Sequence, residues 1–128
     1  ICGNNRSLYE RMVAQGNPLH KICKFVDNME EMMAASDVMI TKPGGLSIVE
    51  ALVNHLPLIF FSAIPGQEAG NVRVLAEHGI GMSGRPLADI AAEIKALAAS
   101  SERLAAAREA TKVLARPDSV EKIIQQLA

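Results

Sequence analysis

The chain has 128 residues, which is the usual size of a single domain and is long enough to bury a core. It is 49% hydrophobic but only 3% aromatic, a composition that excludes a disordered chain and a protein that binds nucleic acid by stacking bases. The formal net charge is −1, and no basic stripe of the kind that holds a phosphodiester backbone is visible. We therefore expect no nucleic-acid partner.

Two cysteines, Cys2 and Cys23, are too few for a disulfide framework and lack the spacing of a metal site. This usage is typical of a reducing, cytoplasmic compartment. The sequence contains neither HExxH nor zinc-type Cys/His spacing, and it lacks GxGxxG. We therefore expect no bound metal and no NAD or FAD cofactor. No apolar run reaches the roughly 18–20 residues that a membrane-spanning helix needs.

The chain begins with Ile1 instead of Met, and Ile1–Cys2 resembles the end of a strand that runs into a turn at Gly3. No internal repeat or low-complexity linker divides the sequence. We therefore expect residues 1–128 to form one domain that is truncated at its N-terminus.

Apolar runs and helical patterns alternate along the first 82 residues. Strands are predicted at Ile1–Cys2, Lys21–Val26, Asp37–Thr41, Pro57–Phe61 and Gly79–Met82. Helices are predicted at Ser7–Ala14, at Met29–Ser36, from Leu46 to about Asn54, and at Val72–Gly79. The Asp37–Thr41 run is typical of a parallel strand that is buried on both faces. The alternation predicts an α/β fold with a Rossmann-like parallel sheet flanked by helices.

After Gly84 the pattern becomes entirely helical. Ile90, Ile94 and Leu97 repeat at helical spacing and predict one buried stripe. A second helix is predicted at Ser101–Ala115. Asp118 and Glu121 begin a third helix, whose apolar face consists of Val120, Ile123, Ile124 and Leu127. We expect this face to remain partly uncovered in the chain as it stands.

In a sheet of this kind the loops that follow the strands meet at one edge, where ligands bind. The four loops are Gly3–Asn5, Asp27–Asn28, Lys42–Gly45 and Ser62–Asn71. They contain most of the glycine and asparagine residues that could approach a ligand. Their expected convergence is stronger evidence for a site than any one loop.

The turn at Pro43-Gly44-Gly45 connects a predicted strand to a predicted helix. Its two glycines let the backbone pass close to a ligand, and the amides of the helix N-terminus suit a phosphate or diphosphate. Glu50 lies about 7–8 Å farther along the helix at ~1.5 Å per residue, where a carboxylate could accept from sugar hydroxyls. The alternative is that the glycines only form a tight corner between strand and helix.

A second polar cluster is Gly66–Asn71, with the sequence GQEAGN. Gln67, Glu68 and Asn71 offer hydrogen-bond donors and acceptors close together, as recognition of several sugar hydroxyls requires. The alternative is a solvated loop in which Gly70 or Asn71 serves as the N-cap of the next helix.

The segment Phe25–Met29 follows the second predicted strand. Its backbone could pair with the edge of a nucleotide base, and Phe25 or Met29 could cover the face of that base. The alternative is that Phe25 belongs to the core and that Asn28 only caps a helix.

Four motifs in order resemble the C-terminal, donor-binding half of GT-B glycosyltransferases: CGNN, FVDNMEEMMAASDVMITKPGGLSIVEAL, LPLIFF and IPGQEAGN. Among the GT-B glycosyltransferases, the sequence is most similar to the monogalactosyldiacylglycerol synthase and processive diacylglycerol glucosyltransferase group. The peptidoglycan UDP-N-acetylglucosamine transferase is a more distant likeness. The resemblance covers roughly Ile1–Met82 by motif, and it implies that the fold is one half of a GT-B enzyme with a helical C-terminal tail.

The resemblance implies roles for matching positions. It places Phe25 and Val26 against the uracil, Gly44 and Gly45 at the diphosphate, and Glu50 at the ribose hydroxyls. The Gly66–Asn71 cluster would face the transferred hexose. The full implied set is Gly3, Asn5, Phe25, Val26, Lys42, Gly44, Gly45, Glu50, Gln67, Glu68 and Asn71.

Members of this group transfer a hexose from a UDP-sugar to a lipid hydroxyl with inversion and without a metal chelated by the donor. The resemblance therefore implies a UDP-hexose as donor substrate, no separate cofactor, and a diacylglycerol-type lipid as acceptor. The half that binds the acceptor and supplies the general base has no counterpart in this chain. We expect no catalytic residue here, no turnover by the chain alone, and a cytoplasmic protein whose membrane association is peripheral and carried by the absent half.

Three other functions fit the same sequence. The chain could be a stand-alone sugar-nucleotide-binding subunit of a two-chain glycosyltransferase. It could be one half of a UDP-sugar 2-epimerase, which shares this architecture. It could also be an α/β domain whose loops bind no ligand.

Overall fold

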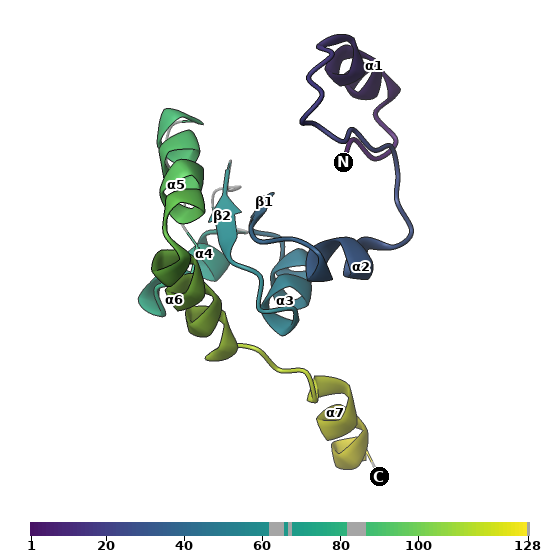
Figure 1. The fold of residues 1–128 in the computed structure, drawn as a ribbon. Helices are drawn as coiled ribbons and strands as arrows, with labels where there is room; N and C mark the ends of the chain where they lie inside the picture. Colours follow the sequence, from purple (N-terminus) through teal and green to yellow (C-terminus); the bar gives the residue numbers. More distant parts are fainter. Residues whose placement is uncertain (62–65, 67, 82–86, 128) are drawn as a thin grey trace. The chain divides into compact units, whose positions relative to one another are not determined.

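The computed structural model describes residues 1–61, 66, 68–81 and 87–127 (Figure 1). They form a mixed α/β structure with a small parallel sheet. The elements are α1 (Arg6–Ala14), α2 (Met29–Ala34), β1 (Met39–Thr41), α3 (Gly45–Val53), β2 (Leu58–Phe60), α4 (Ala69–Glu77), α5 (Leu87–Ala99), α6 (Ser101–Lys112) and α7 (Ser119–Leu127). The chain divides into two compact units, Ile1–Met32 and Met33–Ala128.

The first unit contains α1, which the sequence predicted almost to the residue. Asn5 caps this helix, since its Oδ1 accepts a hydrogen bond of 2.9 Å from the backbone N–H of Leu8. The two strands predicted here, Ile1–Cys2 and Lys21–Val26, are not formed. The backbone N–H of Cys2 does donate to the carbonyl of Cys23 at 2.7 Å, so the two segments lie side by side. A single hydrogen bond does not form the repeating backbone pairing of a β-sheet, so both strand predictions were wrong.

Helix α2 follows Asn28, as predicted, and ends at Ala34, two residues earlier than the sequence suggested. Asn28 and Glu31 contact each other through their side chains, with Nδ2 of Asn28 donating to Oε2 of Glu31 over 2.9 Å.

The sheet in the second unit pairs β1 with β2 in parallel, and Ile40 lies opposite Ile59. Helix α3 connects the two strands, forming a βαβ unit. Strand β2 is buried throughout. The prediction that Asp37–Thr41 is buried on both faces was wrong, because Ile40 in β1 is 46% exposed. Its partner Ile59 in β2 is only 1% exposed, because Ile90 and Leu97 of α5 pack against it.

Helices α3 and α4 end in the same way. After α3, His55 has a left-handed backbone with φ +53°, and the N–H of Leu56 returns to the carbonyl of Ala51 at 2.9 Å. After α4, Gly79 has φ +69°, and the N–H of Ile80 returns to the carbonyl of Leu75 at 2.8 Å. This hydrogen-bond pattern stops the helix and directs the next apolar residue into the core. Gly79–Gly81 therefore form a helix end, so the predicted strand there was wrong over these three residues; Met82 lies outside the described residues.

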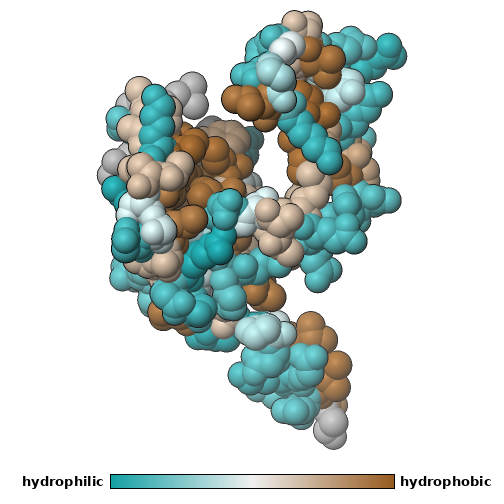
Figure 2. Space-filling model, in the orientation of Figure 1, coloured by the Kyte–Doolittle hydropathy of each residue, from teal (hydrophilic) through white to brown (hydrophobic). Residues whose placement is uncertain are grey.

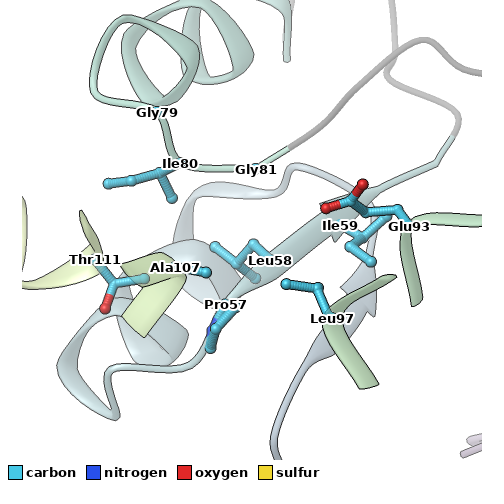
Figure 3. Close-up of a pocket in the computed structure, with 10 residues that line it drawn as sticks. All are labelled: Pro57, Leu58, Ile59, Gly79, Ile80, Gly81, Glu93, Leu97, Ala107 and Thr111. Atoms are coloured by element: carbon cyan, nitrogen blue, oxygen red, sulfur yellow. The ribbon is translucent and has the colours of Figure 1, made fainter. Parts of the chain in front are cut away.

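The core of the second unit forms where α5 and α6 cover the sheet. Ile59 of β2 packs with Ile90 and Leu97 of α5, which confirms most of the predicted stripe, while Ile94 remains 36% exposed. A hollow of about 80 Å³ lies beside β2, and Gly79–Gly81 help to line it. Figure 3 shows the residues around this hollow. Glu93 at its rim accepts two hydrogen bonds from Arg103, at 2.7 and 2.8 Å, which hold α5 against α6.

Helix α7 is amphipathic, and its apolar side is uncovered in the structure (Figure 2). The apolar residues are between 59% and 82% exposed: Val120, Ile123, Ile124 and Leu127. The expectation of an uncovered face is confirmed.

Candidate functional site

The turn between β1 and α3 brings the two predicted glycines into an open position. Pro43 is buried, and the N–H of Gly44 closes the turn on the carbonyl of Lys42 at 2.8 Å. A Cβ built on Gly44 or Gly45 would meet no atom within 4 Å. Gly44 has φ −74° and ψ 137°, which any L-residue can adopt. Packing within the described protein does not require a glycine at either position. At Gly44 the backbone conformation does not require one either.

The first turn of α3 leaves its amides available. Gly44 is the N-cap, and glycine has no side chain with which to cap a helix. Among the described residues, none accepts a hydrogen bond from the backbone N–H of Gly45, Leu46 or Ser47. The three amides and the positive end of the helix dipole therefore suit an anionic oxygen-rich group.

A second helix N-terminus meets this turn. Asn71 lies in the first turn of α4, and its Nδ2 donates to the carbonyl of Pro43 at 3.0 Å. Glu68 is the N-cap of α4 but does not cap it through its side chain. The alternative in which Gly70 or Asn71 caps the helix was wrong, because α4 begins at Ala69. The structure thus joins two segments that lie 28 residues apart and that the sequence singled out separately.

Two charged candidates lie near the turn in the chain. Glu50 is on the exposed side of α3, four residues from Leu46 and therefore on the same face of the helix. Lys42 is also exposed. Neither side chain forms an ion pair or side-chain hydrogen bond with any other described residue. Both groups are free to contact a ligand.

A cleft of about 230 Å³ opens beside the turn, between α3 and α4. Apart from Asn71, its lining is glycine and aliphatic side chains. The residues that line it are Gly45, Ile48, Val49, Leu52, Asn71, Val74, Leu75 and Leu114.

Four candidates lie in the first unit. A hollow of about 400 Å³ there is lined by Gly3, Asn4, Arg6, Lys24 and Phe25. Phe25 is 69% exposed, so the alternative that it belongs to the core was wrong. Val26 is half-buried next to it, while Asn5 has its side-chain oxygen occupied by the cap of α1.

Sequence reasoning missed the two cations of this hollow. Arg6 opens α1 and pairs with Glu10 at 2.7 Å, and Lys24 lies 4.9 Å from the ring centre of Tyr9. The sequence could have indicated both residues, because Arg6 directly follows the CGNN motif and Lys24 directly precedes Phe25. The remaining candidate, Gln67, lies outside the described residues.

Two negative findings concern the described part of the chain. No three His, Cys, Asp or Glu side chains in it gather closely enough to hold a metal ion. None of its helices has the length and apolar character needed to cross a membrane.

Comparison with known proteins identifies the family of the chain. Residues 1–126 match the family described as glycosyltransferase family 28 C-terminal domain, and the chain belongs to this family. The chain is 29% identical over 130 residues to a processive diacylglycerol beta-glucosyltransferase of Bacillus mycoides (strain KBAB4). It is 30% identical over 130 residues to the protein of the same name from Bacillus thuringiensis (strain Al Hakam). Each alignment covers 99% of this chain and 34% of the relative, so the chain spans about a third of the length of these relatives.

Proposed function

We propose that this chain is the donor-binding domain of an inverting glycosyltransferase that moves a hexose from a UDP-sugar to a diacylglycerol-type lipid. The observation that carries the proposal is the open turn at Gly44–Gly45, where α3 and α4 both present N-termini without side-chain caps. The family supports a glycosyl transfer reaction, and the names of the relatives support diacylglycerol as acceptor and glucose as the transferred sugar.

In this proposal the diphosphate binds at the amides of Gly45, Leu46 and Ser47. Charge develops on the departing UDP during transfer, and amides that already point at that position stabilise it without rearranging. Lys42 adds a positive charge, and Glu50 accepts from the ribose hydroxyls. By the resemblance, the Gly3–Asn5 loop also belongs to the diphosphate. Phe25 and Val26 are assigned to the uracil, and Gln67, Glu68 and Asn71 to the hexose and the adjoining phosphate.

We further propose that the domain is one half of a GT-B fold with a Rossmann-like sheet. Parallel strands bond through alternate residues, and Met39 and Thr41 bond to the β2 side. Ile40 therefore directs its backbone N–H and C=O to the open edge of β1. An apolar, 46% exposed residue at an open edge is the expected attachment point for a further strand of a larger sheet.

The proposal is tested by titrating UDP into the ¹⁵N-labelled chain and following its amide signals. We expect saturable shifts at Gly45, Leu46 and Ser47 at millimolar UDP or below. Uridine, which lacks the diphosphate, serves as the control and should leave these three signals nearly unchanged. Absence of any shift at millimolar UDP would contradict the proposal. We also expect the chain alone to release no UDP from UDP-glucose in the presence of diacylglycerol, because it spans only about a third of the length of its relatives.

A further inference from the structure

The side chain of Asn71 contacts the Pro43–Gly45 turn directly. Its side-chain amide lies 3.0 Å from the carbonyl oxygen of Pro43. A carbonyl oxygen can only accept, so Asn71 must donate through Nδ2. This amide group is therefore engaged by the protein itself. None of the described residues donates a hydrogen bond to Oδ1, so only this atom remains for a sugar or for solvent.

The turn has few other restraints on its position. The N–H of Gly44 bonds to the carbonyl of Lys42 within the turn, which shapes the turn without attaching it to the rest of the domain. A Cβ at Gly44 or Gly45 would find open space, so the turn is not packed on the side to which a Cβ would point. The Pro43 ring is buried, and Gly44 accepts a hydrogen bond of 3.1 Å from the N–H of Ile48 in α3. The bond from Asn71 is the one that joins the turn to α4.

We propose that Asn71 is a positioning residue, which holds the Pro43–Gly45 turn so that the first amides of α3 face the diphosphate. The inference rests on the proposed function. If the turn samples other positions, only a fraction of molecules is ready to bind, and the apparent affinity falls by that fraction. The same bond also joins the first turn of α4 to the turn that precedes α3.

The Asn71→Ala variant tests the inference through two ligands. If Asn71 only binds the hexose, its substitution should lower the affinity for UDP-glucose and leave the affinity for UDP unchanged. If Asn71 positions the turn, its substitution should lower both affinities by the same factor, because both ligands carry the diphosphate. We expect an equal loss of roughly three- to ten-fold for UDP and UDP-glucose, the size that one lost hydrogen bond supports.

Asn54→Ala is the matched control. The side chain of Asn54 also donates to a backbone carbonyl, that of Glu50 at 2.9 Å, but at the opposite end of α3. It should affect folding stability about as much as Asn71→Ala and leave the affinity for both ligands unchanged. In the ligand-free chain, Asn71→Ala should shift the amide signals of Gly44 and Gly45, and Asn54→Ala should not. If Asn71→Ala does not fold, Asn71→Ser takes its place, because the serine side chain is too short for its hydroxyl to reach the carbonyl of Pro43.

The possible outcomes separate the two claims. Equal losses for both ligands, with shifted signals at Gly44 and Gly45, support the positioning role. A loss for UDP-glucose alone, or no loss for either ligand, overturns it while the proposed function stands. If the unmodified chain binds neither ligand, the proposed function fails and the role of Asn71 in it fails as well.

Discussion

At the scale of single residues, the glycines of this chain differ in the reason for their presence. Gly81 is required by the protein, because its φ is +74° and a Cβ there would collide with the ring of Phe60. Gly45 lies in a helix and has open space around it. A glycine that neither packing nor helical geometry requires points to something outside the chain that approaches the backbone, and in the proposed function this is the diphosphate.

The same substitution at these two positions should therefore have opposite effects on stability. Gly45→Ala should raise the free energy of unfolding by up to about 1 kcal/mol, because alanine favours a helix more than glycine does. Its methyl group should at the same time weaken UDP binding by roughly ten-fold or more, because it separates the amides from the phosphate oxygens. Gly81→Ala should lower the free energy of unfolding by about 2–5 kcal/mol through overlap and backbone strain. Urea denaturation and UDP titration measure the two effects. A destabilised Gly45→Ala variant would show that this glycine has a structural role.

At the scale of elements, α3 and α4 use the same C-terminal motif with different residues at the left-handed position. His55 adopts this conformation after α3 and Gly79 after α4. Left-handed geometry costs a non-glycine residue about 1–2 kcal/mol. The chain tolerates this cost after α3 because the buried Leu56, which follows, is 2% exposed and contributes to the core.

Exchanging the residue types at these positions should change stability in opposite directions. His55→Gly should raise the free energy of unfolding by about 1 kcal/mol, because glycine adopts positive φ without strain. Gly79→Ala should lower it by about the same amount, since a Cβ there meets nothing within 4 Å and only the backbone strain remains. The two midpoints of urea denaturation provide the comparison. A loss of stability in His55→Gly would mean that the imidazole makes a favourable contact that outweighs the strain.

At the scale of the whole molecule, the two units differ in how much they bury. None of the residues 1–32, all of which the structure describes, is buried. The second unit contains the sheet and the core around Ile59. Burial of apolar side chains is the main source of folding free energy, so the two units should differ in local stability.

Hydrogen exchange of backbone amides should reveal this difference directly. The amides of α1 should exchange quickly, within the range of frayed helices, because α1 has no buried residue. The amides of β2 should be the slowest, because all three of its residues are buried. Mass spectrometry or NMR after transfer to D₂O measures both in one sample. Equal protection of α1 and β2 would contradict the expected difference.

Local patterns in the sequence determined most helices, the strand–turn–helix at Ile40–Leu52 and the second strand of the sheet. These elements form through hydrogen bonds and apolar spacing among near neighbours, which the sequence displays directly. The family was also determined by the sequence, since four ordered motifs identify it without any contact information.

Only the tertiary structure decided which predicted strands form and how the polar residues are used. A strand needs a partner with matching backbone groups, so Lys21–Val26 can have strand-like composition and yet no ladder. The amide of Asn71 could have faced a ligand, capped α4 or bonded to the protein, and its sequence context fits all three. The choice of Pro43 as its acceptor depends on how the chain brings together residues 28 positions apart, which no local pattern contains.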